Sequence, residues 1–252
     1  MSTLEIRDAS KSFVQPGTNR VLNVLEHVSL SASSGEFISI VGPSGCGKST
    51  LLRLIAGFEV PTSGEVVLDQ KKVEGPDYLR GMVFQKSGLF PWLNVEKNIS
   101  FGPRMRGDTE DLDSRVDYML ELAGLTAFRN SYPHQLSGGM AQRVALVRTL
   151  INNPDVLLLD EPLGALDAFT RMNMQDVLLR MWQDRNATMV MVTHDIDEAI
   201  YMGTRVVIMA PRPGRVIESI DIDLPYPRNR SGEKFTDYRV RILNRLSLGH
   251  RD

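Results

Sequence analysis

Nine consecutive residues of this chain combine glycines, a lysine and hydroxyl groups in a spacing that suits phosphate binding. They run Gly42-Pro43-Ser44-Gly45-Cys46-Gly47-Lys48-Ser49-Thr50 and fit the pattern G-x-x-x-x-G-K-[ST]. Residues without side chains let successive backbone N–H groups turn toward phosphate oxygens. The Lys48 ammonium can reach the β- and γ-phosphates of a nucleotide, and the Ser49 hydroxyl can ligate Mg²⁺. Because Cys46 lies within this loop, we expect its alkylation to block turnover and bound nucleotide to protect it.

Two acidic residues, Asp160 and Glu161, follow the apolar run at residues 156–159. A carboxylate at the tip of such a strand, close to the glycine loop, suits a Mg²⁺ contact, direct or through water. The neighbouring Glu161 would point in another direction, toward an attacking water. Alone, an Asp-Glu pair is as often a solvated strand end, but together with the glycine loop it favours the catalytic interpretation.

A second apolar run, at residues 189–192, ends in Thr193 and His194. Both runs are short and uninterrupted, as expected of parallel strands buried on both faces. Polar residues at the carboxyl ends of such strands are where open α/β sheets bind ligands. An isolated histidine is more often structural, but its position after this run favours a contact with the nucleotide.

The elements that must position these residues can also be predicted. Residues 37–41 form an apolar strand that runs directly into the glycine loop, and the stripe at residues 51–55 predicts a helix that Gly57 could cap. Short alternating stretches at residues 4–7 and 28–31 predict half-exposed strands. Further strands are expected at residues 64–68, 205–209 and 216–220, the last two separated by a turn at residues 211–214.

In the segment between the two α/β parts of the chain, apolar residues recur with the spacing of a helix. From residue 94 to residue 153 strand signals fade, and Val116, Met119, Leu120 and Ala123 repeat with a helical period. We therefore expect one domain in three parts: an α/β lobe from residues 1–93 and 154–224, a helical lobe at 94–153, and a tail helix at 225–252. The tail's apolar residues share one helical face, which favours packing on its own domain over docking to a partner; they are Phe235, Tyr238, Ile242, Leu243 and Leu246.

Composition excludes some classes of function. The 252 residues include 29 basic and 31 acidic ones, which gives no support to a nucleic-acid-binding surface. A single cysteine rules out an intrachain disulfide and fits a reducing compartment. The start lacks an apolar core of signal-peptide length, and nowhere do 18 or more apolar residues run together. We therefore expect any membrane role to depend on a partner.

The order of the motifs resembles the ATP-binding cassette (ABC) ATPases, the motor subunits of membrane transporters. Leu136-Ser137-Gly138-Gly139-Met140 resembles that family's signature, which usually ends in Gln. Gln85 stands where the family has its Q-loop glutamine, and residues 156–162 match its Walker B strand. Residues 165–167 match its D-loop, and His194 matches its switch histidine. The resemblance covers essentially the whole chain.

The resemblance implies a fold and a set of roles. The fold would be α/β: a P-loop NTPase core with a mostly parallel sheet flanked by helices, an N-terminal antiparallel β-subdomain and an inserted α-helical subdomain. Glu161 would polarise the attacking water, His194 would contact the γ-phosphate, and Gln85 would sense Mg²⁺ and link the site to the helical lobe. Phe13 would stack on adenine in place of the usual Tyr, although a core Phe is the alternative.

Whole sets of site residues follow from the same resemblance. The implied catalytic residues are Lys48, Gln85, Glu161 and His194. The implied ATP contacts are Phe13, residues 42–50, Gln85, Asp160, Glu161 and His194, and the implied Mg²⁺ contacts are Ser49, Gln85 and Asp160. Ser137, Gly138, Gly139 and Asp167 would complete the ATP site of the opposite protomer, so the working unit would be a homodimer that encloses two ATP molecules.

Finer details resemble importers of nitrate, sulfonate, taurine and related small solutes. The supporting segments are residues 85–92, Met140 in the signature, and residues 211–215 followed by 223–225, whereas Leu163 and Gly164 depart from that group. Trp92 would lie beside a groove for a transmembrane permease subunit near residues 85–92, although a core position is the alternative.

The resemblance implies a setting at the cytoplasmic face of a bacterial inner or cell membrane. The chain would be a peripheral subunit there, a periplasmic or extracellular solute-binding protein would be an indirect partner, and no nucleic acid would be bound. A soluble, non-transport ABC ATPase of repair or translation is the alternative function.

Overall fold

The computed structural model of the chain describes residues 3–15, 17–185, 187–211 and 213–248. Its strands are β1 (Leu4–Val14), β2 (Val21–Ala32), β3 (Phe37–Val41), β4 (Ser63–Leu68), β5 (Lys71–Lys72), β6 (Arg80–Val83), β7 (Val156–Asp160), β8 (Thr188–Val192), β9 (Arg205–Ala210) and β10 (Arg215–Asp221). Its helices are α1 (Lys48–Ala56), α2 (Val95–Arg106), α3 (Leu112–Leu122), α4 (Gly138–Leu150), α5 (Ala168–Arg185), α6 (Ile196–Met202) and α7 (Glu233–Leu248), with 3₁₀ turns at Thr126–Phe128 and Pro133–Gln135.

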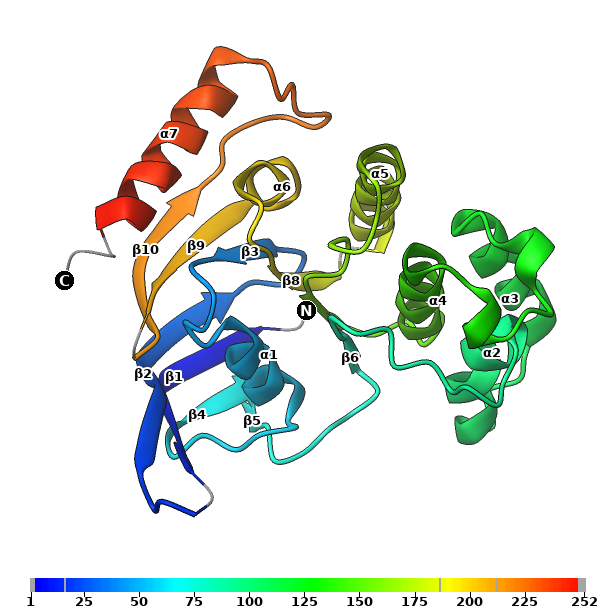
Figure 1. Cartoon of the computed structure of the whole chain (residues 1–252), viewed down its shortest axis with the longest axis horizontal. Coiled ribbons are helices and arrows are strands. Elements are labelled where there is room, and N and C mark those ends of the chain that lie inside the picture. Colours follow the sequence, from blue (N-terminus) through cyan, green and yellow to red (C-terminus); the bar gives the residue numbers. More distant parts are fainter. Residues whose placement is uncertain (1–2, 16, 186, 212, 249–252) are drawn as a thin grey trace.

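The described strands form two sheets (Figure 1). The larger has the order β10-β9-β3-β8-β7-β6, in which all neighbours are parallel except the edge strand β10. The smaller has the order β2-β1-β4-β5 and is antiparallel. The predicted α/β class, with a mostly parallel sheet and an N-terminal antiparallel sheet, is confirmed.

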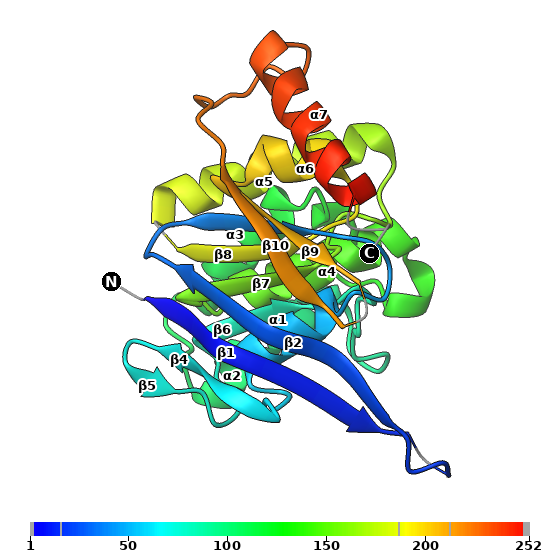
Figure 2. The same ribbon diagram turned by 90° about the vertical axis from the view of Figure 1, so that its left-hand side faces the viewer.

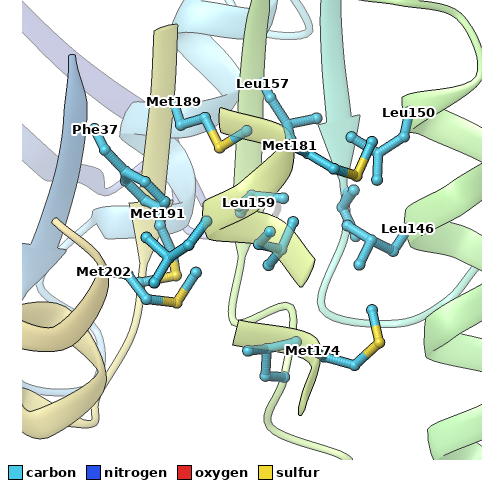
Figure 3. Packing of buried hydrophobic residues seen from close by; sticks show 14 of the residues in the cluster. Phe37, Leu146, Leu150, Leu157, Leu159, Met174, Met181, Met189, Met191 and Met202 are labelled. Atoms are coloured by element: carbon cyan, nitrogen blue, oxygen red, sulfur yellow. The ribbon is translucent and has the colours of Figure 1, made fainter. Parts of the chain in front are cut away.

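The larger sheet is buried on both faces, which explains its uninterrupted apolar strands. Successive side chains of a strand point to opposite faces. In β3, Phe37 and Val41 therefore join one core cluster, and Ile38 and Ile40 join the other. Figure 3 shows the first cluster, in which methionines of α5, α6 and β8 fill the space between Phe37 and the leucines of β7 and α4. Each such fully buried side chain contributes about 1.5–3 kcal/mol.

Glycines fix both ends of the helix after the glycine loop. Gly47 precedes α1 with φ +92°, and a Cβ there would stand 2.5 Å from the Leu25 side chain. Gly57 ends the helix at φ +80°, and its N–H donates to the Leu54 carbonyl at 3.2 Å. The predicted helix and its glycine cap are thus confirmed, since only glycine adopts this backbone conformation without strain.

Helices α2, α3 and α4 occupy the interval between β6 and β7, and they lie together at one end of the molecule (Figure 1). The four residues that set the helical period in the sequence, Val116, Met119, Leu120 and Ala123, are all buried there. Among the described residues, no helix is long and apolar enough to cross a membrane.

The first strands and two further elements differ from the sequence-based expectation. β1 and β2 are much longer than the predicted stretches, because they pair with each other through register shifts that interrupt the alternation. The sequence analysis did not predict β6 or α5. The four residues of β6, Arg80–Val83, are too few and too mixed in polarity to show the alternation of a strand. The sequence of α5 has no clear apolar stripe of helical period.

The tail helix also differs from its prediction. α7 begins at Glu233 rather than at residue 225, because Pro225 and Pro227 hold the preceding segment outside helical geometry. Phe235 and Ile242 are buried against the domain, whereas Leu243 is 45% exposed and does not belong to the packed face. α7 lies beside α6 (Figure 2). Residues 249–252 of the predicted tail, and Arg212 of the predicted turn, lie outside the described residues.

Candidate functional site

The predicted site residues follow four neighbouring parallel strands. β3, β8, β7 and β6 are adjacent in the sheet, so their carboxyl ends share one edge (Figure 1). The glycine loop follows β3, Thr193 and His194 follow β8, and Glu161 follows β7. Gln85 lies two positions after the end of β6. Residues that are far apart in the sequence thus meet where open α/β sheets bind ligands.

The glycine loop has the backbone that phosphate binding requires. Gly45 and Gly47 have φ of +78° and +92°. At Gly42, a Cβ would stand 2.7 Å from the Met209 carbonyl oxygen, so a side chain is excluded. Lys48 is 7% exposed, and its Nζ donates to the carbonyls of Gly42 at 2.7 Å and Pro43 at 2.9 Å. The ammonium is therefore held across the mouth of the loop.

Ser49 and Asp160 form a pair that suits a divalent cation. The Ser49 hydroxyl donates to Asp160 Oδ1 at 2.9 Å, and Asp160 is 4% exposed. Burial raises the pKa of the Asp160 carboxyl, while the Ser49 hydrogen bond opposes that shift. A hydroxyl and a carboxylate oxygen are hard ligands of the kind that Mg²⁺ uses when phosphates and water complete its shell. The donor set fits Mg²⁺.

Glu161 lies between Gln85 and His194. Its Oε2 accepts from Gln85 Nε2 at 3.0 Å and lies 3.5 Å from His194 Nδ1. Glu161 has φ +47°, a left-handed conformation that is uncommon for a residue other than glycine, and its N–H donates to the Val192 carbonyl at 2.9 Å. The adjacent acids have different partners, because Glu161 contacts Gln85 and His194 whereas Asp160 contacts Ser49.

Cys46 lies in the glycine loop with its thiol shielded from solvent. Its side chain is completely buried, with Sγ 3.8 Å from Lys48 Nζ. Burial raises the pKa of the thiol, and the nearby lysine opposes that shift. Both access to the thiol and its thiolate fraction are therefore reduced, so we expect slow labelling, while inhibition of turnover by the alkylated residue and protection by ATP stay predictions.

The signature residues are exposed at the start of α4. Ser137 caps this helix by accepting from the Met140 N–H at 3.2 Å, and both Ser137 and Gly138 are exposed. A Cβ at Gly139 would stand 3.0 Å from the Leu166 side chain, so the signature packs against the D-loop segment of its own chain. In the described part of the chain, no hydrogen bond or ion pair joins residues 137–139 to residues 42–50.

The remaining predicted residues lie on the flanks. Asp167 Oδ1 accepts from the Thr170 N–H at 3.0 Å, and this backbone hydrogen bond lowers the pKa of Asp167. Phe13 lies on β1 with Lys11 Nζ 4.8 Å from its ring centroid. Its hairpin runs beside the glycine loop, since the Val24 carbonyl of β2 lies 3.1 Å from where a Cβ of residue 47 would stand.

Comparison with known proteins identifies the family. The family model described as "ABC transporter" matches residues 25–164, more than half of the chain. The chain belongs to the ABC transporter family. It is 44% identical over 98% of its length to the aliphatic sulfonates import ATP-binding protein SsuB of Bacillus cereus, covering 97% of that protein. It is likewise 44% identical over 98% of its length to the taurine import ATP-binding protein TauB of Roseobacter denitrificans, covering 94% of that protein.

A solved structure gives the same family. The dimeric post-hydrolysis state of the ATP-binding cassette MJ0796 bound to ADP and Pi is 33% identical to this chain, with a TM-score of 0.79, and the match covers 87% of this chain and 98% of that one. This cassette therefore binds and hydrolyses ATP as an ABC-type ATPase. The non-transport alternative is not favoured, because these relatives are named import proteins.

The structure also reveals residues around the cassette's Q-loop that the sequence analysis missed. From α4, Arg148 donates to the carbonyls of Ser87 at 3.1 Å and Gly88 at 2.9 Å, and Gln142 Nε2 donates to the Phe84 carbonyl at 3.1 Å. The helix that begins with the signature therefore holds the segment that carries Gln85. No local pattern in the sequence indicated these contacts, because they depend on how α4 packs across residues 84–88.

Proposed function

We propose that this cassette powers the import of a sulfonate, taurine or similar small solute, and that its residues act as the family resemblance implies. The observation that carries the proposal is the convergence of Lys48, Ser49–Asp160 and Gln85–Glu161–His194 at one sheet edge. The names of the relatives, which are import proteins for aliphatic sulfonates and taurine, support the solute class.

The proposed chemistry is in-line attack of water on the γ-phosphate. The glycine loop and Lys48 hold the phosphates, and Ser49, Asp160 and Gln85 would hold Mg²⁺, which would supply positive charge to neutralise the phosphate oxygens. Glu161 orients the attacking water, and His194 contacts the γ-phosphate from the neighbouring strand end. The amide of Gln85 holds the Glu161 carboxylate at 3.0 Å and thereby fixes its direction.

Glu161→Gln tests this assignment. The substitution keeps the side-chain volume but removes the base, so we expect hydrolysis to fall by about 10²–10⁴-fold while ATP binding persists. Phosphate release and equilibrium ATP binding by the purified full chain are the measurements. Glu65→Gln is the matched control and should retain full turnover, because the Glu65 side chain on β4 is 37% exposed and pairs with Arg7. Unchanged hydrolysis in Glu161→Gln would refute the role of this carboxylate.

We further propose that two chains enclose two ATP molecules. Each glycine loop would face the signature residues Ser137, Gly138 and Gly139 of the opposite protomer, with Asp167 beside them. The exposure of Ser137, Gly138 and Asp167, together with the dimeric state of the solved cassette relative, supports this arrangement. A hydroxyl and backbone N–H groups at a helix start are suited to hold the γ-phosphate.

Permease docking is proposed at a hollow between β6 and the helical lobe. The hollow has a volume of about 490 Å³ and includes Phe90, Phe101 and Arg148 in its lining. The rings of Phe90 and Phe101 lie 4.4 Å apart, and Trp92, 5.7 Å from Phe90, is 70% exposed. An exposed aromatic cluster beside Gln85 suits an amphipathic helix of a transmembrane subunit.

Co-purification tests the docking site. With the chain co-expressed with its permease subunits, Trp92→Asp should abolish their recovery while leaving ATP binding intact. Undiminished recovery would refute the site. On this proposal the chain is a peripheral subunit on the cytoplasmic face of the membrane. It has three parts: an α/β lobe formed by residues 1–93 together with 154–224, a helical lobe at residues 94–153, and a tail at residues 225–252.

A further inference from the structure

Both neighbours of His194 are tied to a single buried residue, Glu198: Thr193 through its carboxylate and Asp195 through its backbone N–H. Thr193 Oγ1 donates to Glu198 Oε2 at 2.5 Å and accepts from the Asp195 N–H at 3.1 Å. The Asp195 side chain in turn caps α6 by accepting from the Glu198 N–H at 3.1 Å. The backbone on each side of His194 is therefore fixed to the first turn of α6, and Glu198 is the point where these contacts meet.

A second buried side chain extends this contact into α5. Gln175 Nε2 donates to Glu198 Oε1 at 3.1 Å, and Gln175 and Glu198 are only 1% and 4% exposed. Gln175 Oε1 accepts from Nη2 of Arg230, a tail residue. The amide orientation is set by its two partners, because the NH₂ group must face the carboxylate and the oxygen must face the guanidinium. A relay of Arg230, Gln175 and Glu198 thus runs from the tail to the loop of His194.

Arg230 is itself held in place. Its guanidinium lies over the ring of Tyr201, 3.8 Å from the ring centroid, and the Tyr201 hydroxyl donates to Asp176 Oδ1 at 2.8 Å. The tail segment before it is fixed by Arg228, which is 5% exposed and donates to the Gly203 carbonyl at 2.5 Å. The tail end of the relay is therefore attached to α5 and α6, which are neighbours in Figures 1 and 2.

We propose that Arg230, Gln175 and Glu198 are positioning residues for His194, and that the tail thereby sets the rate of ATP hydrolysis. The inference rests on the role proposed above for His194. A carboxylate costs free energy to bury, and the pKa of Glu198 is raised chiefly by burial. A satisfied network of this kind holds its members in one geometry. That geometry fixes Thr193 and Asp195, between which His194 stands.

Arg230→Met breaks the relay at its most accessible member, because Arg230 is only partly buried. We expect kcat for ATP hydrolysis by the purified full chain to fall about 3- to 10-fold. The KM for ATP and the melting temperature should change little. Arg241→Met is the matched control: it removes a tail arginine whose partner, Glu218, retains Arg245. The control should keep the wild-type kcat. Arg230→Lys, which keeps a donor, should recover part of the lost rate.

A double-mutant cycle with His194→Ala distinguishes positioning from a general structural effect. If the relay acts through His194, Arg230→Met has no further effect on single-turnover hydrolysis in the His194→Ala background. An equal loss in both backgrounds, or no loss in the wild-type background, would overturn the inference and leave the proposed function intact. Unchanged hydrolysis by His194→Ala itself would instead refute the role of His194, and the relay with it.

Discussion

Cys46 illustrates how burial decides the chemistry of a single side chain. It lies in the middle of the phosphate loop, yet its side chain is completely buried and its pKa is raised by that burial. The thiolate is the reactive form, so both access and ionisation limit reaction with an alkylating reagent. Sequence position alone could not reveal this, because Cys46 belongs to a core cluster that also contains Met209, far along the chain.

We therefore expect Cys46 to be alkylated at least about 10-fold more slowly in the native chain than in urea. The native rate should keep increasing with pH above the range in which an ordinary thiol is already ionised, because the raised pKa delays thiolate formation. Mass spectrometry of iodoacetamide-treated protein across a pH series measures both effects. Equal rates in the native and unfolded chains would contradict the burial.

The positions of some site residues could be predicted from the sequence, whereas the contacts of others could not. Asp160 and His194 follow apolar runs, and the structure places both at the carboxyl ends of parallel strands. The contacts of Gln142 and Arg148 with the Q-loop could not be predicted, since they depend on how α4 packs across residues 84–88. Side chains whose role depends on tertiary packing leave no local pattern.

At the scale of elements, one buried asparagine organises the segment between β6 and α2. Asn98 is completely buried, and its Oδ1 accepts from the Phe90 N–H at 2.9 Å. Its Nδ2 donates to the carbonyls of Leu93 at 2.9 Å and Asn94 at 3.0 Å. A segment without regular structure has backbone groups that need partners, and this amide supplies them.

Asn98→Ala should lower the free energy of unfolding by about 2–3 kcal/mol, because it leaves buried backbone groups of the segment without partners. Urea unfolding of the purified chain is the measurement. Asn229→Ala is the control: Asn229 is exposed, and its side chain accepts only the nearby Ser231 N–H in the contacts described, so its loss should have little effect. A similar, small change in both variants would show that Asn98 does not organise the segment.

Element types were predictable where the periodicity was strong. The strand before the glycine loop, helix α1 and its cap at Gly57 follow directly from the sequence. β6 was missed because its four residues show no clear pattern, and α7 begins late because prolines precede it. Boundaries set by tertiary contacts, such as the Arg228 hydrogen bonds that hold the tail, are not visible in local sequence.

At the scale of the whole molecule, the glycine loop and the signature are both present once, but no described hydrogen bond or ion pair joins them. The proposed dimer resolves this separation, because a two-fold axis brings each loop opposite the other chain's signature. A site made in this way has a genetic consequence that a site within one chain does not have: two defective chains can complement each other.

Lys48→Met removes the loop function, and Ser137→Arg blocks the signature, so each variant alone should have almost no hydrolysis. In an equal mixture, half of the dimers are mixed, and each mixed dimer has one intact site, formed by the good loop of one chain and the good signature of the other. The mixture should therefore recover about a quarter of wild-type phosphate release. Mixing Lys48→Met with Glu161→Gln is the control, since both defects then lie on the loop side and no site is restored. Phosphate release by the first mixture no higher than that of its components would refute the shared site.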